Sequence, residues 1–190
     1  MLHQQGLSKG QVIIGLGTDT DRDTNMHTAL DALHDRFGEL QLSAVYASRP
    51  VTSAELSVSS LTASAPDYWN AVVAFQCDDD VADIHQCLKS IETDCGRDRQ
   101  QPRVAMDIDL LFVGDVVGVI DGIELPRPEM DQYAYILRPL SELFPDVTCP
   151  GRLQTFHQLW EAVSHHAQLC PVDFVWRQQV VSVAPPCLPM

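Results

Sequence analysis

The chain is poor in basic residues. Its 190 residues include 12 Lys and Arg against 26 Asp and Glu, which gives a formal net charge of −14 at pH 7. A surface of that sign repels the phosphate backbone of nucleic acids and the headgroups of anionic lipids. General nucleic-acid or membrane binding is therefore excluded as a first hypothesis, and any phosphate site must be confined to a small part of the surface.

Long hydrophobic runs and metal-binding cysteine patterns are also missing. No stretch approaches the roughly 18 apolar residues of a membrane-spanning helix, and the N-terminal segment lacks the apolar core of a secretory signal. The six cysteines form no Cys-x-x-Cys pair and no cluster with histidine, so we expect reduced thiols rather than a zinc site. These features predict a cytoplasmic protein without a membrane or nucleic-acid partner.

The rest of the composition is typical of a globular domain. Hydrophobic residues make up 45% of the chain and charged residues 20%, which excludes a disordered acidic tail. A chain of this length can bury a sizeable core within one domain. We expect that domain over residues 11–166, with an N-terminal tail at 1–10 and a C-terminal extension at 167–190.

Hydrophobic spacing predicts alternating strands and helices. Short β-branched or alternating segments predict strands at 11–17, 40–48, 68–77 and 105–113, with a turn and short strand at 115–119. Apolar residues three and four positions apart predict helices from Asp21 or Asp23 to Gly38, from Asp80 to Cys95, and at 130–143 and 156–165. We expect a loop at 51–65 and a tail at 184–190. This order predicts an α+β fold with helices packed on a sheet.

Two aspartates stand out in the strand at 105–113. Asp107 and Asp109 flank Ile108, and alternate residues of a strand point to the same side, so both carboxylates are expected on one face. Two negative charges held together on an apolar strand are unfavourable unless a cation lies between them. Mg²⁺ fits this role because it binds one or two carboxylates together with substrate phosphates. The alternative is an edge strand with two solvated acids.

Basic residues gather just before this strand. Arg97, Arg99 and Arg103 are three of the chain's 12 Lys and Arg and lie within seven positions. Guanidinium groups bind phosphate through paired hydrogen bonds, so the cluster favours a local phosphate site. A basic loop that neutralises nearby acids is the alternative. Together with the two aspartates, the cluster indicates a site for a nucleoside triphosphate bound with a metal.

Short stretches spread along the chain combine into a wider pattern. They are Gly15-Leu-Gly-Thr-Asp19, Tyr46 to Pro50, Ala65 to Ala71, Gly96-Arg-Asp-Arg99, Pro102-Arg103, Met106 to Phe112, Leu125-Pro126 and Arg138-Pro-Leu140. In order and spacing this pattern resembles the 6-hydroxymethyl-7,8-dihydropterin pyrophosphokinases of folate synthesis, over roughly residues 11–150. The resemblance implies a ferredoxin-like α+β fold with a mainly antiparallel sheet.

The resemblance also implies an activity. Pyrophosphate would be transferred from ATP to the hydroxymethyl group of the pterin, with AMP as the second product. Asp107 and Asp109 would hold two Mg²⁺ ions, and Arg97 and Arg103 would bind the phosphates and act in catalysis. No protein nucleophile is needed, because such phosphoryl transfer rests on positioning and electrostatics. The implied partners are small molecules, and we expect a monomer or weak dimer.

Two further sets of residues follow from the same resemblance. The ATP site would add Glu92, Arg99, Leu110 and Arg127 to the two arginines. The pterin site would comprise Ser48, Val51, Tyr68, Asn70 and Tyr135. Asn70 is also favoured physically, because an amide inside an apolar strand is unfavourable without a partner, although it could merely satisfy a backbone group. The alternatives are that Tyr68 and Tyr135 are ordinary aromatic residues of the core or the cavity rim, and that Glu92 is a solvent-facing residue.

The chain also departs from the family pattern. Only Gln100-Gln101 separates the Gly96-Arg-Asp-Arg99 stretch from Pro102-Arg103, where the family has a longer loop that closes over the substrates. In addition, Arg127 occupies a position where the family usually has His. A short loop is less able to exclude water from a reaction. The alternative hypothesis is therefore a non-catalytic or repurposed relative that binds nucleotide, another ligand or a protein partner.

Overall fold

The structure, a computed structural model, describes residues 6–49, 68–98, 100–101, 103–128 and 130–185. Its elements in chain order are β1 Gln11–Thr18, α1 Arg22–Phe37, β2 Gln41–Leu42, β3 Tyr46–Ser48, β4 Tyr68–Gln76, α2 Val81–Asp94, β5 Asp107–Val113, β6 Gly118–Ile120, β7 Ile123–Leu125, the 3₁₀ turn η1 Met130–Gln132, α3 Ala134–Leu143, α4 Phe156–Ser164, β8 Leu169–Pro171, β9 Phe174–Trp176 and β10 Gln179–Ser182. The predicted α+β class is confirmed.

The main sheet has the strand order β5-β1-β4-β3-β8, and β2 also pairs with β4. Each of these pairs is antiparallel. Helix α1 connects β1 to the β2 and β3 region, and α2 connects β4 to β5, so two β-α-β units interleave in one sheet. This is the predicted ferredoxin-like arrangement. Two small hairpins, β6–β7 and β9–β10, lie outside the main sheet.

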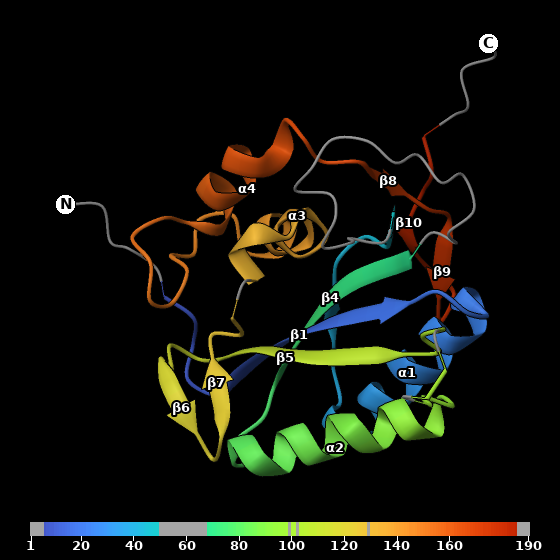
Figure 1. The fold of residues 1–190 in the computed structure, drawn as a ribbon, viewed down its shortest axis with the longest axis horizontal. Helices are drawn as coiled ribbons and strands as arrows, with labels where there is room; N and C mark the ends of the chain where they lie inside the picture. Colours follow the sequence, from blue (N-terminus) through green and yellow to red (C-terminus); the bar gives the residue numbers. More distant parts are fainter. Residues whose placement is uncertain (1–5, 50–67, 99, 102, 129, 186–190) are drawn as a thin grey trace.

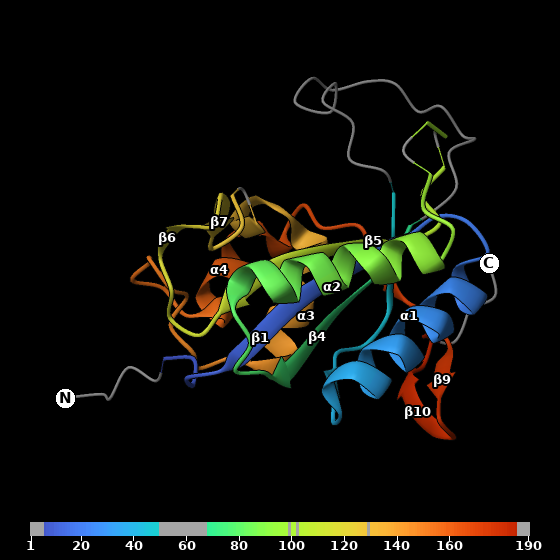
Figure 2. The same cartoon turned by 90° about the horizontal axis from the view of Figure 1, so that it is seen from below.

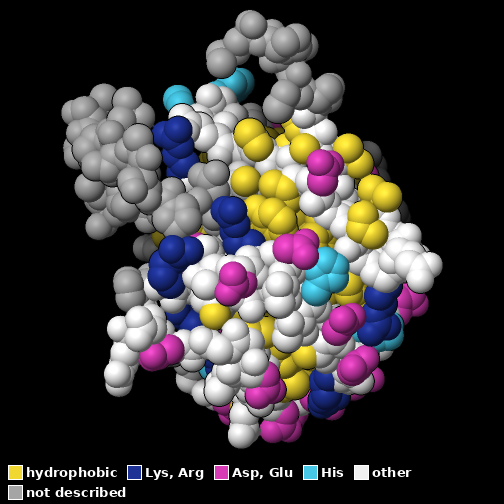
Figure 3. Space-filling view, turned by 90° about the vertical axis from the view of Figure 1, so that its right-hand side faces the viewer, with side chains coloured by type: hydrophobic (Ala, Val, Ile, Leu, Met, Phe, Trp, Pro, Cys, Tyr) yellow, Lys and Arg dark blue, Asp and Glu magenta, His cyan; other side chains and the backbone are white. Residues whose placement is uncertain are grey.

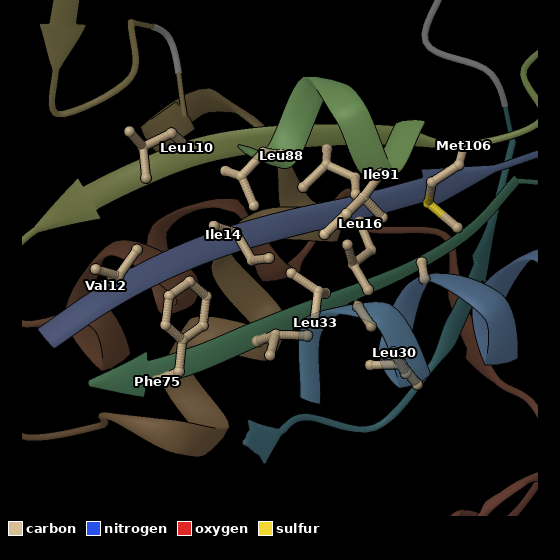
Figure 4. Packing of buried hydrophobic residues seen from close by; sticks show 14 of the residues in the cluster. Val12, Ile14, Leu16, Leu30, Leu33, Phe75, Leu88, Ile91, Met106 and Leu110 are labelled. Carbon is tan, nitrogen blue, oxygen red and sulfur yellow. The ribbon is translucent and has the colours of Figure 1, made fainter. Parts of the chain in front are cut away.

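Helices cover both faces of the sheet (Figures 1 and 2). Helices α1 and α2 lie on one face and α3 and α4 on the other. Alternation along β1 builds both cores, because Val12, Ile14 and Leu16 pack toward α1 and α2 while Ile13 packs toward α3 and α4. Figure 4 shows the first set meeting side chains from both covering helices. The sheet is therefore held between two apolar layers, which fixes the register of its strands.

Some boundaries differ from the prediction. The predicted strand at 40–48 is two short strands, β2 and β3, separated where the Ser43 hydroxyl accepts a hydrogen bond from the Val72 amide at 3.0 Å. The predicted helix at 130–143 is η1 followed by α3, because the backbone of Tyr133 between them is extended, with φ −103° and ψ 115°. Asp21 and Asp80 occupy the N-cap positions of α1 and α2, but neither side chain accepts a capping hydrogen bond.

The part of the chain predicted as a C-terminal extension, 167–190, contains strands that hydrophobic spacing did not reveal. Strand β8 pairs with β3 and forms an edge of the main sheet. The β9–β10 hairpin packs on α1, where the Trp176 indole N–H donates to Asp31 at 3.0 Å and Arg177 pairs with the same carboxylate at 3.1 Å. The predicted loop at 51–65 and the end of the predicted tail, 186–190, lie outside the described residues.

In the described part of the chain, no helix is both long enough and apolar enough to cross a membrane. The five described cysteines are free thiols, as predicted: Cys77, Cys87, Cys95, Cys149 and Cys170. On the face shown in Figure 3, several basic side chains lie on the left, and others lie at the lower right among acidic side chains.

Candidate active site

A cavity of about 230 Å³ opens on the face of the sheet that carries α3. Its walls come from β1, β3, β4 and β5 and from the first turn of α3. Six residues predicted from the sequence line it together: Ser48, Tyr68, Asn70, Asp107, Asp109 and Tyr135. Arg49 also lines it; this arginine lies in the Tyr46 to Pro50 stretch of the family pattern, but the sequence analysis gave it no role in the site.

The two aspartates lie on one side of β5, as alternation predicted. Both are partly exposed, whereas Ile108 between them is fully buried on the opposite side. Burial first, and then the neighbouring charge of Asp107, raises the pKa of Asp109 to about 6. Arg127 forms an ion pair with Asp109 and acts in the opposite direction, but it does not outweigh those two effects.

Two glycines of β1 form the floor between the acids and the next strand. Gly15 pairs with Asp109, and Gly17 pairs with Asp107 on one side and with Asn70 on the other. A Cβ atom on Gly17 would lie 3.6 Å from the Asn70 side-chain oxygen. Because neither glycine carries a side chain, the space between the carboxylates and the amide stays open.

The pair of carboxylates fits a magnesium site. Hard oxygen ligands on one strand, facing an open cavity, are the donor set through which Mg²⁺ binds together with substrate phosphates. Within the described residues, no group of three or more His, Cys, Asp or Glu side chains could hold a metal ion. Asp107 and Asp109 are the two carboxylates that line the cavity, so a metal bound here would rely on them together with substrate oxygens.

The opposite wall carries an amide and two aromatic rings. Asn70 is buried, and its Nδ2 donates a hydrogen bond to the Ser48 hydroxyl at 2.9 Å. Burial first, and then the neighbouring carboxylate of Asp19, raises the pKa of Tyr68. Burial raises the pKa of Tyr135 to about 12, so both phenols are neutral near pH 7. Val51, predicted for the same wall, lies outside the described residues.

Asp19 is a residue of this region that the sequence did not identify. It is only 5% exposed, and its carboxylate accepts hydrogen bonds from the Val104 amide at 2.8 Å and from Arg103 Nε at 3.3 Å. Arg103 also donates to the Asp19 carbonyl at 2.7 Å. Burial by itself would raise the pKa of Asp19, but hydrogen bonds from Thr20, Val104 and Arg103 outweigh it, so the pKa is lowered. Its signals in the sequence were its position directly after β1 and its place at the end of the Gly15-Leu-Gly-Thr-Asp19 stretch.

The predicted phosphate-binding arginines differ in their surroundings. Arg103 is anchored at the end of β1 by Asp19, yet its side chain remains 53% exposed. Arg97 donates its backbone N–H to the Glu92 carbonyl at 3.0 Å. The Nε atom of Arg97 is buried and has no hydrogen-bond partner within the described part of the chain. Arg99 lies outside that part.

Two residues predicted for the ATP site are buried away from the cavity. Glu92 is 2% exposed, so the alternative of a solvent-facing residue is wrong. Its carboxylate accepts from the Ile108 amide at 2.7 Å and pairs with Lys89, whose ammonium donates to the Ile108 carbonyl at 2.9 Å. Leu110 is 5% exposed and packs in the core on the α1 and α2 side (Figure 4). Neither side chain lines the cavity.

Comparison with solved structures shows the same fold in larger proteins. The crystal structure of wild-type Plasmodium falciparum HPPK-DHPS with pteroate matches with a TM-score of 0.66 and 12% sequence identity, over 94% of this chain and 50% of that chain. At that identity the likeness concerns the fold alone.

Curated relatives are more similar in sequence. A 2-amino-4-hydroxy-6-hydroxymethyldihydropteridine pyrophosphokinase of Synechocystis sp. is 35% identical over 101 residues, which are 52% of this chain and 51% of that protein. The chain thus matches about half the length of this relative. An enzyme of the same name from Pseudomonas aeruginosa is 29% identical over 147 residues, covering 74% of this chain and 84% of the relative.

A sequence profile of one family matches most of the domain. The profile is described as 7,8-dihydro-6-hydroxymethylpterin-pyrophosphokinase and matches residues 13–145, from β1 to just beyond α3. This range includes both aspartates of β5 and the described residues of the opposite cavity wall. The chain belongs to the 7,8-dihydro-6-hydroxymethylpterin-pyrophosphokinase family.

Proposed function

We propose that the chain transfers the pyrophosphoryl group of ATP to the hydroxymethyl group of 6-hydroxymethyl-7,8-dihydropterin, giving AMP, in folate synthesis. The observation that carries the proposal is the cavity in which Asp107 and Asp109 face the buried amide of Asn70 across two glycines of β1. One wall offers oxygen ligands for a metal-bound triphosphate. The other offers hydrogen bonds and aromatic surface for a flat heterocycle. Family membership supports the same assignment.

Asp107 and Asp109 are the proposed ligands of two Mg²⁺ ions. Mg²⁺ would neutralise charge on the triphosphate and align it with the acceptor. A metal ligand must be deprotonated, and a pKa of about 6 leaves Asp109 largely ionised at pH 7 and above. The open floor at Gly15 and Gly17 gives phosphates access to both carboxylates.

The pterin would occupy the wall formed by β3, β4 and α3. Asn70, fixed by its hydrogen bond to Ser48, would hydrogen-bond the polar edge of the ring. Tyr135 would pack against the ring face and Tyr68 would close the rim. Val51 is proposed for the same pocket on the family pattern.

The arginines would hold the phosphates. Arg97 has a buried donor without a described partner, and Arg103 is positioned by Asp19 while much of its guanidinium remains exposed. Arg99 and Arg127 would add phosphate contacts. Of the two buried residues predicted for the ATP site, Glu92 lies behind β5 and would act through the Ile108 amide of that strand, whereas Leu110 is a core residue of β5 itself.

The chemistry needs no covalent intermediate with the protein. The hydroxymethyl oxygen of the pterin attacks the β-phosphorus of ATP while the bond from that phosphorus to the α–β bridging oxygen breaks. AMP leaves with the bonding electrons, and the hydroxyl proton passes to solvent. The residues of the cavity contribute alignment of the two substrates and stabilisation of the charge that develops on the phosphoryl oxygens.

A second candidate is a relative that binds a metal nucleotide without transferring pyrophosphate. The observation in its favour is that Arg103 and Arg127, both proposed for phosphates, already pair with Asp19 and Asp109. The test is to incubate the protein with ATP, Mg²⁺ and the pterin and to follow AMP by chromatography, with Asp107→Asn as control. AMP that needs both the pterin and Asp107 supports the transferase. Magnesium-dependent nucleotide binding without AMP supports the second candidate.

A further inference from the structure

The two carboxylates of the cavity differ in their surroundings. Arg127 forms an ion pair with Asp109. No basic side chain of the described residues forms such a pair with Asp107. The Arg127 backbone N–H donates to the Leu111 carbonyl at 3.0 Å, so the arginine is anchored beside β5 while its side chain stays 40% exposed. One acid therefore has a built-in counter-ion and the other does not.

A guanidinium and a divalent cation cannot occupy the same side of one carboxylate. Arg127 donates to the Oδ1 atom of Asp109, and its positive charge repels any cation that approaches the same carboxylate. The burial of Asp109 strengthens this repulsion, since its side chain is only 23% exposed. Metal binding to this pair is therefore opposed by the ion pair between Arg127 and Asp109.

Resting on the proposed function, we propose that Arg127 competes with the divalent cation for Asp109 and thereby couples metal binding to nucleotide binding. Without nucleotide, the ion pair between Arg127 and Asp109 opposes the metal, so the metal alone binds weakly. A triphosphate supplies that partner, because guanidinium binds phosphate oxygens as well as carboxylates. Arg127 thus makes the site selective for a metal nucleotide over the free metal.

The first test measures Mn²⁺ binding to the full chain without nucleotide, by titration calorimetry. Arg127→Gln should bind Mn²⁺ about tenfold more tightly than the wild type, as expected when an ion pair of about 1.4 kcal/mol no longer has to be broken. Arg36→Gln is the matched control, because Arg36 also pairs with an acid, Asp79, which does not line the cavity. It removes the same charge and should leave the affinity unchanged. Equal affinities for wild type and Arg127→Gln would overturn the proposal.

A second variant keeps the test decisive if Arg127→Gln folds poorly. Arg127→Lys keeps the charge beside Asp109 and should bind free Mn²⁺ within about threefold of the wild type. A tenfold gain in Arg127→Lys as well would show that the positive charge is not the competitor. Circular dichroism and the midpoint of thermal unfolding establish that each variant is folded before its titration is compared.

The third measurement tests the coupling itself. Mn²⁺ affinity is measured with and without α,β-methylene-ATP, whose α–β bridge cannot be cleaved. The nucleotide analogue should tighten Mn²⁺ binding by a larger factor in the wild type than in Arg127→Gln. Equal factors would overturn the coupling. The two proposals can fail separately. If the wild type forms AMP from ATP and the pterin but Arg127→Gln binds Mn²⁺ with wild-type affinity, only the competition by Arg127 is rejected. If Arg127→Gln binds Mn²⁺ more tightly but the wild type forms no pterin-dependent AMP, only the transferase is rejected.

Discussion

The side-chain amide of Asn70 donates a hydrogen bond to the Ser48 hydroxyl at 2.9 Å, from strand β4 to the neighbouring strand β3. This bond fixes the orientation of the amide and leaves its oxygen beside Gly17 at the floor of the cavity. The amide oxygen is therefore available to accept a hydrogen bond from a ligand. Ser48 positions this oxygen without needing to touch the ligand itself.

Asn70→Ala should weaken pterin binding by about 10- to 100-fold, the effect of losing one or two buried hydrogen bonds. Ser48→Ala should cause a smaller loss, because the amide remains present but is less well oriented. Affinity for α,β-methylene-ATP should change little in either variant. Calorimetric titration with the pterin in the presence of this analogue measures the pterin affinity of each variant, and titration with the analogue alone measures its nucleotide affinity. An equal loss of nucleotide and pterin affinity would argue against separate walls for the two substrates.

Gly17→Ala should reduce affinity for both ligands while leaving the fold intact. The added Cβ would lie in ordinary contact with the Asn70 oxygen at 3.6 Å, so no backbone strain is expected. The methyl group would occupy part of the space between Asp107 and Asn70. We therefore expect the affinities for the nucleotide and for the pterin each to fall by about tenfold, because the ligands no longer fit closely. The thermal midpoint is measured alongside. Unchanged affinities would show that substrates do not pass over Gly17.

Glu92→Ala should lower stability rather than act on nucleotide binding alone. The variant leaves the Ile108 amide without its acceptor and Lys89 without its carboxylate, at a cost of about 2–4 kcal/mol in the free energy of unfolding. Urea unfolding measures this, with the exposed Glu39→Ala as a control expected within about 0.5 kcal/mol of wild type. Wild-type stability combined with lost nucleotide binding would instead assign Glu92 a direct contact with ATP.

Asp19→Asn should reveal the contribution of this carboxylate through its dependence on pH. The folded-state pKa of Asp19 is lowered from 3.8, so its ionised form stabilises the fold above the unfolded-state pKa, and this contribution is lost as pH falls toward the folded-state pKa. At pH 7 the variant should be less stable by about 1–2 kcal/mol, from weakened charge-assisted hydrogen bonds. The difference in urea unfolding should be constant above about pH 5 and shrink as pH falls below about 4. A difference that is constant with pH would contradict this assignment.

The sequence predicted well those elements whose side chains repeat with a clear period. The alternation of Asp107, Ile108 and Asp109 placed both acids on one face, and β5 confirms it. Helices α1 and α2 follow their apolar spacing, and α1 ends at Gly38, whose positive φ of 80° is readily adopted by glycine. The spacing of apolar residues was sufficient to predict an element where one whole face of that strand or helix is buried.

The remaining features depend on contacts between distant residues. Strand β8 has three residues, too few to show a period, and exists because β3 offers it a free edge. Asp19 is buried through Val104 and Arg103, which are more than 80 positions away in the chain. The pairing of Arg127 with Asp109 likewise follows from the turn after β7, which brings the arginine back to β5. No local signal in the sequence encodes such pairings.

The most direct test of the proposed transfer follows the phosphorus atoms themselves. Purified protein is mixed with ATP, Mg²⁺ and 6-hydroxymethyl-7,8-dihydropterin, and the reaction is followed by ³¹P NMR. We expect the ATP signals to be replaced by equal amounts of AMP and a diphosphate ester of the pterin, and Asp107→Asn to abolish both products. Formation of ADP and phosphate, or no consumption of ATP while Mg²⁺ and nucleotide still bind, would contradict the proposed transfer.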